Sequence, residues 1–385
     1  MAGISCAVAV MLLSVGIVLG FKNAIRHKVS GFEAAVSIEP ARNVSGEAMS
    51  PVSVTPLVSA AVGNASPAAE AVPAIRHAGI IKTDDDFLGV VVRSLPSDRQ
   101  GMAFLSDMVS EGAVPSDTSR QVLLSAPQAA RLRLSVGDRV YAYFFVNGAL
   151  KARRYTVGGL FSSNFGDYDD LVAYLPMPEL QGICGLDDGQ CLRIELSGIP
   201  DEDAKEVADR LQQEFNRAYA FGELQEPLVT DTVLRSGAMY YNWLGLLDTN
   251  VVVILILMGC VSGFTLISSV FILILERVRM IGQLKSLGAT DGLIRRVFVL
   301  LGGRIVLWGL AIGNVAALAL LLSQRAWRYI PLDPQAYYLS YVPVEICWWH
   351  VAALDMGVVV VAALLMLVPA AVISRIAPSK TMRFE

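Results

Sequence analysis

The sequence predicts a membrane protein in which four transmembrane α-helices carry a large extracytoplasmic (periplasmic) α/β domain between the first and second helices. Its 385 residues are 54% hydrophobic and only 17% charged, against roughly 25% charged residues in an ordinary soluble domain. The apolar residues gather in four long runs. Residues 22–247 hold 28 acidic and 20 basic side chains, a net charge of −8, whereas the rest of the chain is net positive by 4. A soluble globular chain is therefore excluded.

The first apolar run covers residues 1–21 and contains no charged side chain. About 20 apolar residues at 1.5 Å each cross the roughly 30 Å hydrocarbon core of a bilayer. A cleaved signal peptide is also apolar but begins with a positively charged stretch, and no Lys or Arg precedes this run. We therefore expect an uncleaved transmembrane helix over residues 1–21.

Three further runs predict transmembrane helices at residues 251–275, 297–322 and 351–373. They leave a segment 276–296, a loop 323–350 and a tail 374–385. The segment and the tail together carry eight Lys and Arg residues, whereas the loop carries two. Because basic residues of short loops stay in the cytoplasm, we expect cytoplasmic N- and C-termini and a periplasmic position for residues 22–247 and for the loop.

The outer domain, residues 22–247, shows local signals of a mixed α/β fold. Two β-rich runs, 140–146 and 149–157, are joined by Asn147-Gly148, which is typical of a tight hairpin turn. Residues 192–196 predict a strand. Pro200-Asp201 then opens a predicted helix that carries an apolar stripe. Residues 48–75 have weak periodicity, and we expect strand and loop there.

Two cysteines, Cys184 and Cys191, fall close together in the outer domain. An oxidising compartment permits a disulfide that closes the intervening loop. Two free thiols fit the same spacing, so the sequence leaves both states open.

The chain lacks the usual signatures of catalysis. It has no Gly-rich phosphate-binding loop ending in Gly-Lys-Ser/Thr, and its three histidines are scattered without metal-ligand spacing. An acidic triplet, Asp84 to Asp86, lies beside Lys82, which is typical of a solvated turn. We therefore expect no catalytic residue, no metal and no cofactor in this chain, which would do mechanical or binding work.

The most specific stretch is residues 276–290, with the pattern E-R-x-R-x-I-G-x-L-K-x-L-G-A-T. It predicts a short helix that continues from the second span and places Met280, Ile281, Leu284 and Leu287 on one face. Gly288 is a natural helix stop, and the next helix follows with the Thr290 hydroxyl as its cap. On physical grounds, an amphipathic helix lying among lipid headgroups and a helix that docks on a partner protein are equally compatible with this pattern.

This pattern resembles the signature of the FtsX/MacB-like permeases of ABC transporters. Further stretches resemble the lipoprotein-releasing (LolC/LolE) type of that superfamily, and together they cover nearly the whole chain. These stretches are residues 79–84, 89–93, 134–140, 156–160, 170–175, 331–346 and 369–385. One departure is that the family normally has a basic stretch before the first span, whereas Met1 already lies at the edge of the apolar run.

The resemblance implies a permease subunit that extracts lipoproteins from the inner membrane and passes them towards the outer membrane. Its implied partners are a cytoplasmic ATPase that binds ATP and Mg, a second permease copy or paralogue, the lipoprotein and a periplasmic lipoprotein carrier, and no nucleic acid. The implied ATPase-coupling residues are Glu276, Arg277, Arg279, Ile281, Leu284, Lys285, Leu287, Gly288, Ala289 and Thr290. The acyl chains of the lipoprotein are expected to contact Val15, Leu19, Ile254 and Met258. These four side chains are equally compatible with contact to lipid or to a partner helix.

Two alternatives remain at this stage. A MacB-like efflux permease belongs to the same superfamily, although residues 331–346 favour the lipoprotein-releasing type. An FtsX-like scaffold that regulates a cell-wall hydrolase would need no transport, although an outer segment of this length is large for that role.

Overall fold

The computed structural model describes residues 1–45, 49–236 and 238–366. It divides into two compact units. One, the membrane unit, contains residues 1–24, 242–331 and those from 341 onward; the other, the core domain, contains residues 25–241 and 332–340. Helix α1 (Ala2–Phe32) belongs to both, because its residues 2–24 lie in the membrane unit and the remainder in the core domain.

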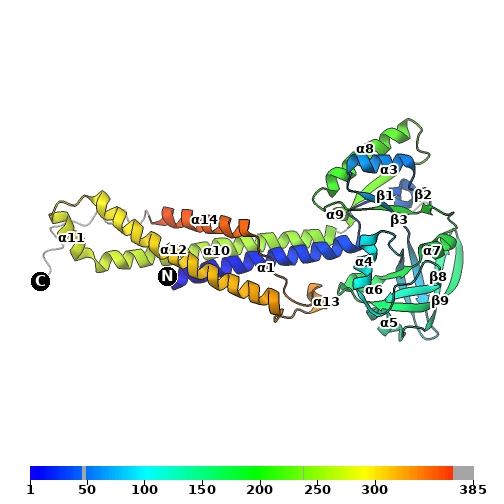
Figure 1. Cartoon of the computed structure of the whole chain (residues 1–385), viewed down its shortest axis with the longest axis horizontal. Coiled ribbons are helices and arrows are strands. Elements are labelled where there is room, and N and C mark those ends of the chain that lie inside the picture. The colour runs from blue at the N-terminus through cyan, green and yellow to red at the C-terminus, as the bar shows by residue number, and fades with distance from the viewer. Residues whose placement is uncertain (46–48, 237, 367–385) are drawn as a thin grey trace. The chain divides into compact units, whose positions relative to one another are not determined.

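Within its described residues, the membrane unit contains four helices that are long and apolar enough to cross a bilayer. They run side by side in Figure 1 and are α1, α10 (Ala238–Glu276), α12 (Asp291–Trp327) and α14 (Trp348–Leu365). The shortest, α14, has 18 residues and therefore spans about 27 Å. The last part of the fourth predicted span, 367–373, and the tail 374–385 lie outside the described residues.

Several helix boundaries differ from the sequence prediction: α12 ends at Trp327 rather than 322, α14 begins at Trp348 rather than 351, and three differences are larger. Helix α1 continues past residue 21 to Phe32, although Lys22, Arg26 and Lys28 end the uncharged run. Helix α10 begins at Ala238 rather than 251, and α12 begins at Asp291 rather than 297. In each case the helix extends into polar sequence, because hydrophobicity marks only the part that crosses lipid.

Small residues let the membrane helices approach closely. A Cβ atom at Gly309 of α12 would lie 2.7 Å from Ile4 Cγ2 of α1, and one at Gly313 would lie 2.7 Å from the Ser5 carbonyl oxygen. Gly3 of α1 packs in the same way on Thr265 of α10. Close approach through small residues is a general means of helix association in lipid, where the hydrophobic effect does not draw helices together.

Few polar contacts join these helices. The Lys22 ammonium of α1 lies 2.7 Å from the Asp248 carboxylate of α10. Asn314 of α12 donates a hydrogen bond of 2.8 Å to Asp355 of α14. The rest of the packing is apolar and centres on one buried cluster from α1, α10, α12 and α14.

The first sheet of the core domain has four antiparallel strands in the order β13-β1-β12-β3. They are β1 (Val36–Pro40), β3 (Glu70–Ala74), β12 (Arg193–Ser197) and β13 (Leu228–Thr232). Helix α8 (Ala204–Ala220) packs on this sheet through the predicted stripe, which includes Val207, Leu211 and Phe215. The strand predicted at residues 192–196 is confirmed as β12, and the predicted helix is confirmed as α8, although α8 begins after Asp203 instead of directly at Pro200-Asp201.

The second sheet closes on itself through its longest strand. Its order is β6-β9-β7-β10-β5-β4-β8, with β8 also paired to β9. Its strands are β4 (Arg76–Lys82), β5 (Phe87–Ser94), β6 (Val109–Gly112), β7 (Gln121–Ser125), β8 (Arg139–Val146), β9 (Ala149–Phe161) and β10 (Val172–Leu175). The predicted hairpin joins β8 to β9: Asn147 and Gly148 have φ angles of 51° and 77°, as a type I′ turn requires.

The remaining elements are short. They are α2 (Ala41–Ser45), β2 (Val52–Ser53), α3 (Pro56–Ala65), α4 (Arg99–Asp107), α5 (Ala126–Leu132), α6 (Gly166–Leu171), α7 (Met177–Cys184), β11 (Gln190–Cys191), α9 (Val233–Ser236), α11 (Val278–Ser286) and α13 (Pro334–Tyr337). Helix α3 corrects the expectation of strand and loop over residues 48–75. The Thr55 hydroxyl accepts the Val58 N–H, and Pro56 occupies the first turn, where its missing N–H costs nothing.

Candidate functional site

The segment between α10 and α12 forms a helix of its own. Arg277, with φ −107° and ψ 12°, separates the end of α10 from α11. The predicted continuation of the second span is therefore corrected to a break followed by nine helical residues. The buried positions keep helical spacing across this break, because Ile281 lies seven residues after Ile274 in the same apolar cluster.

A tight turn ends α11 and starts α12. Gly288 has a φ of +93°, and its N–H donates to the Lys285 carbonyl at 3.1 Å, while the Ala289 N–H donates to the Leu284 carbonyl at 2.9 Å. These two bonds define a Schellman ending, so the predicted helix stop is confirmed. Thr290 occupies the capping position of α12, but its hydroxyl forms no capping hydrogen bond there, which corrects the expected role of this side chain.

The apolar side chains of α11 divide into two faces. Ile281 is fully buried among residues of the membrane unit that include Ile274 and Ile294. Met280, Leu284 and Leu287 are 39%, 37% and 84% exposed, and their spacing of four and three places them on one stripe. The single face predicted for all four is therefore corrected: Ile281 anchors the helix, and the other three form what we call the α11 stripe.

Charged side chains flank the α11 stripe. Glu276, Arg277 and Arg279 are exposed, whereas the Lys285 side chain is only 8% exposed and lies 2.8 Å from the Asp291 carboxylate at the start of α12. Lys285 therefore stabilises the turn between α11 and α12, and the exposed arginines remain accessible to another protein.

The four candidate acyl-chain residues are half-buried on two helices, Val15 and Leu19 on α1 and Ile254 and Met258 on α10. The membrane unit also has an apolar cavity of about 220 Å³, lined by residues of all four long helices, including Met11, Leu255, Gly259 and Val358. None of the four candidates is among the described residues that line this cavity. The cavity and the four candidates share helices α1 and α10, and acyl-chain contact with the four candidates stays a prediction.

A buried cluster of charges lies where the end of α1 meets both sheets of the core domain. Glu33 follows α1, Arg76 and Arg93 belong to the closed sheet, and Arg193 and Glu195 belong to the four-stranded sheet. The shortest distances are 2.8 Å from Arg93 to Glu195 and 3.0 Å from Arg76 to Glu33. Arg193 reaches Glu33 at 3.7 Å and Glu39 of β1 at 3.1 Å. We call these six residues the junction cluster.

The junction cluster sets the ionisation of its members. Burial raises the pKa of Glu33, but the charges of Arg93, Arg76 and Arg193 and the hydrogen bond from Tyr168 outweigh it, so the pKa lies below the ordinary value of 4.5. Arg93 also donates to the Phe32 carbonyl, the last residue of α1. The end of α1 is thus fixed to the core domain by ion pairs and hydrogen bonds that offset part of the lost hydration, while Glu33 Oε2 and Arg193 Nε have no hydrogen-bond partner among the described residues.

The loop between α12 and α14 also contacts the core domain. Its residues 332–340 belong to that unit. Lys28 of α1 donates to the Tyr338 carbonyl at 2.6 Å and to the Ser163 carbonyl at 2.7 Å, and the Tyr338 ring packs on Phe165 with centroids 4.8 Å apart.

The two outer cysteines are free thiols in the structure. Cys191 donates from Sγ to the Val52 carbonyl at 3.2 Å, so this sulfur already has a hydrogen-bond partner. Burial raises the pKa of both Cys184 and Cys191 to about 11, which keeps them protonated and unreactive at neutral pH. The disulfide considered from their spacing is not formed.

The geometry defines a class of protein: a multi-pass membrane permease that carries a large folded domain on its helices. Two family models match the chain, the MacB-like periplasmic core domain over residues 1–214 and the FtsX-like permease C-terminal over residues 252–378. This chain belongs to the FtsX/MacB-like family of ABC-transporter permeases, whose members are non-catalytic subunits. In Figure 1, the first match covers α1 and most of the core domain, and the second covers most of α10 and the elements from α11 to α14.

Curated relatives match over the full chain. Two proteins named lipoprotein-releasing system transmembrane protein LolC, from Xylella fastidiosa strains 9a5c and Temecula1, are each 23% identical over 100% of this chain and 92% of their own length. These relatives support a permease of the LolC type.

Solved structures give weaker matches. The extracellular domain of the ABC-type transporter YknZ from Gram-positive bacteria is 11% identical over 52% of this chain and 99% of its own, with a TM-score of 0.34. A permease domain from Porphyromonas gingivalis is 18% identical over 51% of this chain and 86% of its own, with a TM-score of 0.28. TM-scores this low do not establish the fold of this chain. The family models and the strand order define it instead.

Proposed function

We propose that this chain is the permease subunit of an ATP-driven complex that extracts lipoproteins from the inner membrane for transfer towards the outer membrane. The full-length similarity to two LolC proteins supports the substrate class. The complex would contain a cytoplasmic ATPase, a second permease copy or paralogue, and a periplasmic carrier that accepts the lipoprotein.

The α11 stripe is the observation that carries this proposal. A short helix held by one buried side chain, Ile281, presents Met280, Leu284 and Leu287 to the outside next to Arg277 and Arg279. An amphipathic helix that fits the groove of a partner uses apolar anchors at this spacing. The ATPase would bind ATP and Mg and would dock on the α11 stripe. Docking there requires α11 to lie in the cytoplasm, and both termini of this chain would then also be cytoplasmic.

Two connections lead from α11 towards the core domain. Ile281 packs in the same buried cluster as side chains of α1, α10 and α12, so a displacement of α11 acts on the helices that cross the membrane. Helix α1 continues without a break into the core domain, where the junction cluster fixes its end. Motion of the helices would reach the core domain through this continuous segment.

The size of the extraction cost explains the need for ATP. Burial of one CH₂ group is worth about 0.8 kcal/mol, so one acyl chain of ordinary length represents on the order of 10 kcal/mol. An apolar path along the helices would offset most of this cost, and hydrolysis would drive release. A second permease subunit would supply the other side of that path.

Reconstitution tests the proposal. The chain, its ATPase and its permease partner are placed in proteoliposomes that contain a lipoprotein, and soluble carrier is added outside. We expect lipoprotein to appear on the carrier only with ATP. A lipoprotein whose N-terminal acyl groups have been removed serves as the control. ATP-dependent movement of a soluble compound with no lipoprotein release, or tight co-purification with a cell-wall hydrolase instead, contradicts the proposal.

A further inference from the structure

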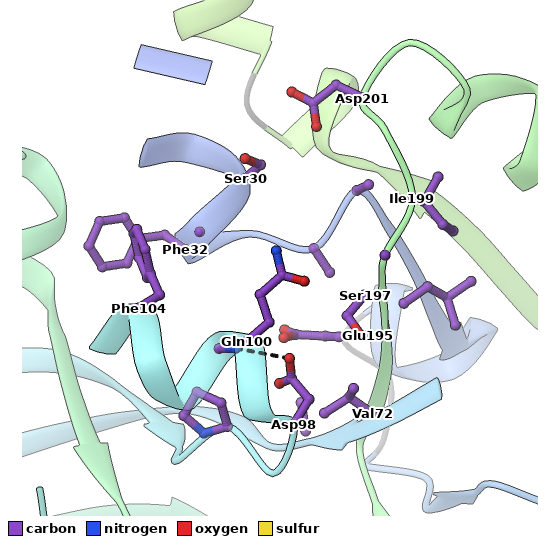
Figure 2. Close-up of a pocket in the computed structure, with 18 of the residues that line it drawn as sticks. Ser30, Phe32, Val72, Asp98, Gln100, Phe104, Glu195, Ser197, Ile199 and Asp201 are labelled. Atoms are coloured by element: carbon purple, nitrogen blue, oxygen red, sulfur yellow. Dashed lines mark hydrogen bonds between the residues drawn. The ribbon is translucent and has the colours of Figure 1, made fainter. Parts of the chain in front are cut away.

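The core domain has a cavity of about 710 Å³ at the end of α1. It is lined by residues of α1, of α4, of both sheets and of the turn before α8. Figure 2 shows Phe32 and Phe104 on one side of it, with Glu195, Ser197 and Ile199 on the other. Ligand sites commonly have volumes of about 300–1,000 Å³ and lie between structural lobes, so both the size and the position suit a bound molecule.

The charges around this cavity are mostly negative. Five carboxylates line it, Asp98, Asp107, Glu195, Asp201 and Glu202, against the guanidinium groups of Arg26 and Arg93. Arg93 is bound by Glu195 through two hydrogen bonds of 2.8 and 3.1 Å, so this pair offers no net charge to a ligand and leaves four carboxylates against the guanidinium group of Arg26. A cavity lined mainly by one sign of charge concentrates the opposite charge within it.

One tyrosine that lines the cavity has no hydrogen-bond partner for its hydroxyl among the described residues. Tyr174 of β10 is only 4% exposed and lines the cavity, and no residue in the described part of the chain forms a hydrogen bond with its hydroxyl. Burial raises the pKa of Tyr174 to about 12, so the hydroxyl carries its proton and can donate. Buried hydroxyl groups normally have a hydrogen-bond partner, and an acceptor on a ligand would supply it.

An aromatic side chain completes the lining. Phe104 of α4 is half-buried in the cavity wall, and its ring packs edge-on against Phe32 with centroids 5.2 Å apart. The face of a phenyl ring attracts a cation such as the head group of Lys or Arg. Phe104 therefore adds apolar contact for the stem of a long basic side chain and attraction for its charge.

We propose that this cavity binds an extended peptide segment that carries a Lys or Arg side chain. The Tyr174 hydroxyl would donate to a peptide carbonyl, while the carboxylates and the Phe104 ring would receive the cation. This inference goes beyond lipoprotein release, since it requires only a peptide of the right charge. The peptide could belong to the transported protein or to a periplasmic partner, and the experiment below separates these sources.

A direct binding measurement tests the site. The full chain is placed in nanodiscs of zwitterionic phosphatidylcholine, so that the lipid does not attract the peptide. The probe is a dye-labelled, end-blocked peptide of alternating Lys and Ser, compared by fluorescence anisotropy with a matched peptide of alternating Glu and Ser. We expect at least tenfold tighter binding of the basic peptide. Equal binding of both peptides, or binding of neither, overturns the proposal.

Substitutions of lining residues test whether the peptide binds in the cavity. Tyr174→Phe removes one hydrogen bond and should weaken binding about threefold to tenfold. Asp107→Asn with Glu202→Gln should weaken it about twofold to tenfold. The matched control Asp117→Asn with Asp188→Asn removes the same charge from residues of the core domain that do not line the cavity. Equal loss in the control and the cavity variants contradicts the assignment.

Competition separates the sources of the peptide. If the free basic peptide inhibits lipoprotein release in the reconstituted complex, the natural segment belongs to the transported protein. If the peptide binds the cavity without changing release, the segment belongs to another protein. Failure of lipoprotein release with intact peptide binding would count against the proposed transport function and leave the peptide site standing.

Discussion

The two units bury polar groups in different ways. In the core domain, the junction cluster surrounds Glu33 with three guanidinium groups, and Arg93 is bound through both of its terminal nitrogens. In the membrane unit, Asn314 and Asp355 share one hydrogen bond without an opposite charge. Among the described residues, each unit holds two buried side-chain atoms without a hydrogen-bond partner: Glu33 Oε2 and Arg193 Nε in the core domain, and Asn314 Oδ1 and Asp355 Oδ1 in the membrane unit. The core domain therefore adds a charged anchor at the end of α1 to its large apolar core, whereas the membrane helices are held mainly by packing through small residues.

This difference indicates what each region can tolerate. A buried charge that loses its partner is expensive, because neither water nor a counter-ion compensates it. A polar pair between membrane helices contributes less to the free energy of unfolding, because double-mutant measurements of such pairs average about 0.6 kcal/mol. The junction cluster should thus determine the stability of the core domain, and the glycine contacts should determine the packing of the helices.

The largest effect is expected from Arg93→Ala. This change leaves Glu195 and Glu33 with fewer counter-charges in a buried site and should lower the free energy of unfolding of the core domain by about 3–5 kcal/mol. The measurement is labelling of the buried thiols Cys184 and Cys191 in a chain whose other three cysteines are Ser. Labelling at the parent rate contradicts the role of Arg93.

Glu33→Gln should show a smaller effect that depends on pH. Because the pKa of Glu33 in the folded chain lies below 4.5, its carboxylate stabilises the fold fully above pH 4.5, and this contribution is lost as pH falls through the lowered value. At pH 7 the variant should lose about 1.5–3 kcal/mol. Thiol-labelling rates measured from pH 7 downwards should converge for parent and variant, and a constant difference contradicts the assignment.

Gly313→Val tests the packing of the membrane unit. A Cβ atom at this position would lie 2.7 Å from the Ser5 carbonyl and 2.9 Å from Val8 Cβ, so α1 and α12 would have to separate, at a cost of about 1–3 kcal/mol. The measurement is the thermal loss of monodisperse protein in detergent. Gly303→Val is the matched control, because an added Cβ there meets no atom within 4 Å, and equal losses contradict the packing account.

The smallest effect is expected from Asn314→Leu, which removes the hydrogen bond to Asp355. We expect a loss of about 0.6–1.7 kcal/mol in the same thermal measurement. A loss as large as that of Arg93→Ala would show that the membrane pair stabilises its unit as strongly as the junction cluster stabilises the core domain, and would remove the contrast between the two regions.

Local features could be predicted from the sequence. Asn147-Gly148 specifies its hairpin because the turn needs positive φ angles at two adjacent residues, and the stripe of α8 follows from the spacing of its apolar residues. Helix α3 was missed although Thr55 and Pro56 carried a start signal, because its apolar residues lie in a composition that also suits strands. The bounds of α1 were missed because charge ended the hydropathy signal before the helix ended.

The functional sites depend on contacts that no local pattern reveals. Arg93 and Glu195 are 102 positions apart, and Arg93 and Phe32 are 61 apart, so the junction cluster exists only once both sheets have formed. On α11, the sequence identified the right apolar residues but not the break at Arg277. Ile281 is buried in the same cluster as Ile274, whereas Leu284 and Leu287 are exposed.

Docking of the ATPase on the α11 stripe is the central claim and can be tested by one pull-down. Leu284→Asp places a charge in the stripe, whereas Ser286→Asp places the same charge on another exposed side of α11. Both tagged variants are purified from membranes together with the second permease, and the bound ATPase is quantified. We predict that Leu284→Asp retains the second permease but loses at least nine-tenths of the ATPase, and that Ser286→Asp retains both. Full ATPase binding by Leu284→Asp would contradict the account.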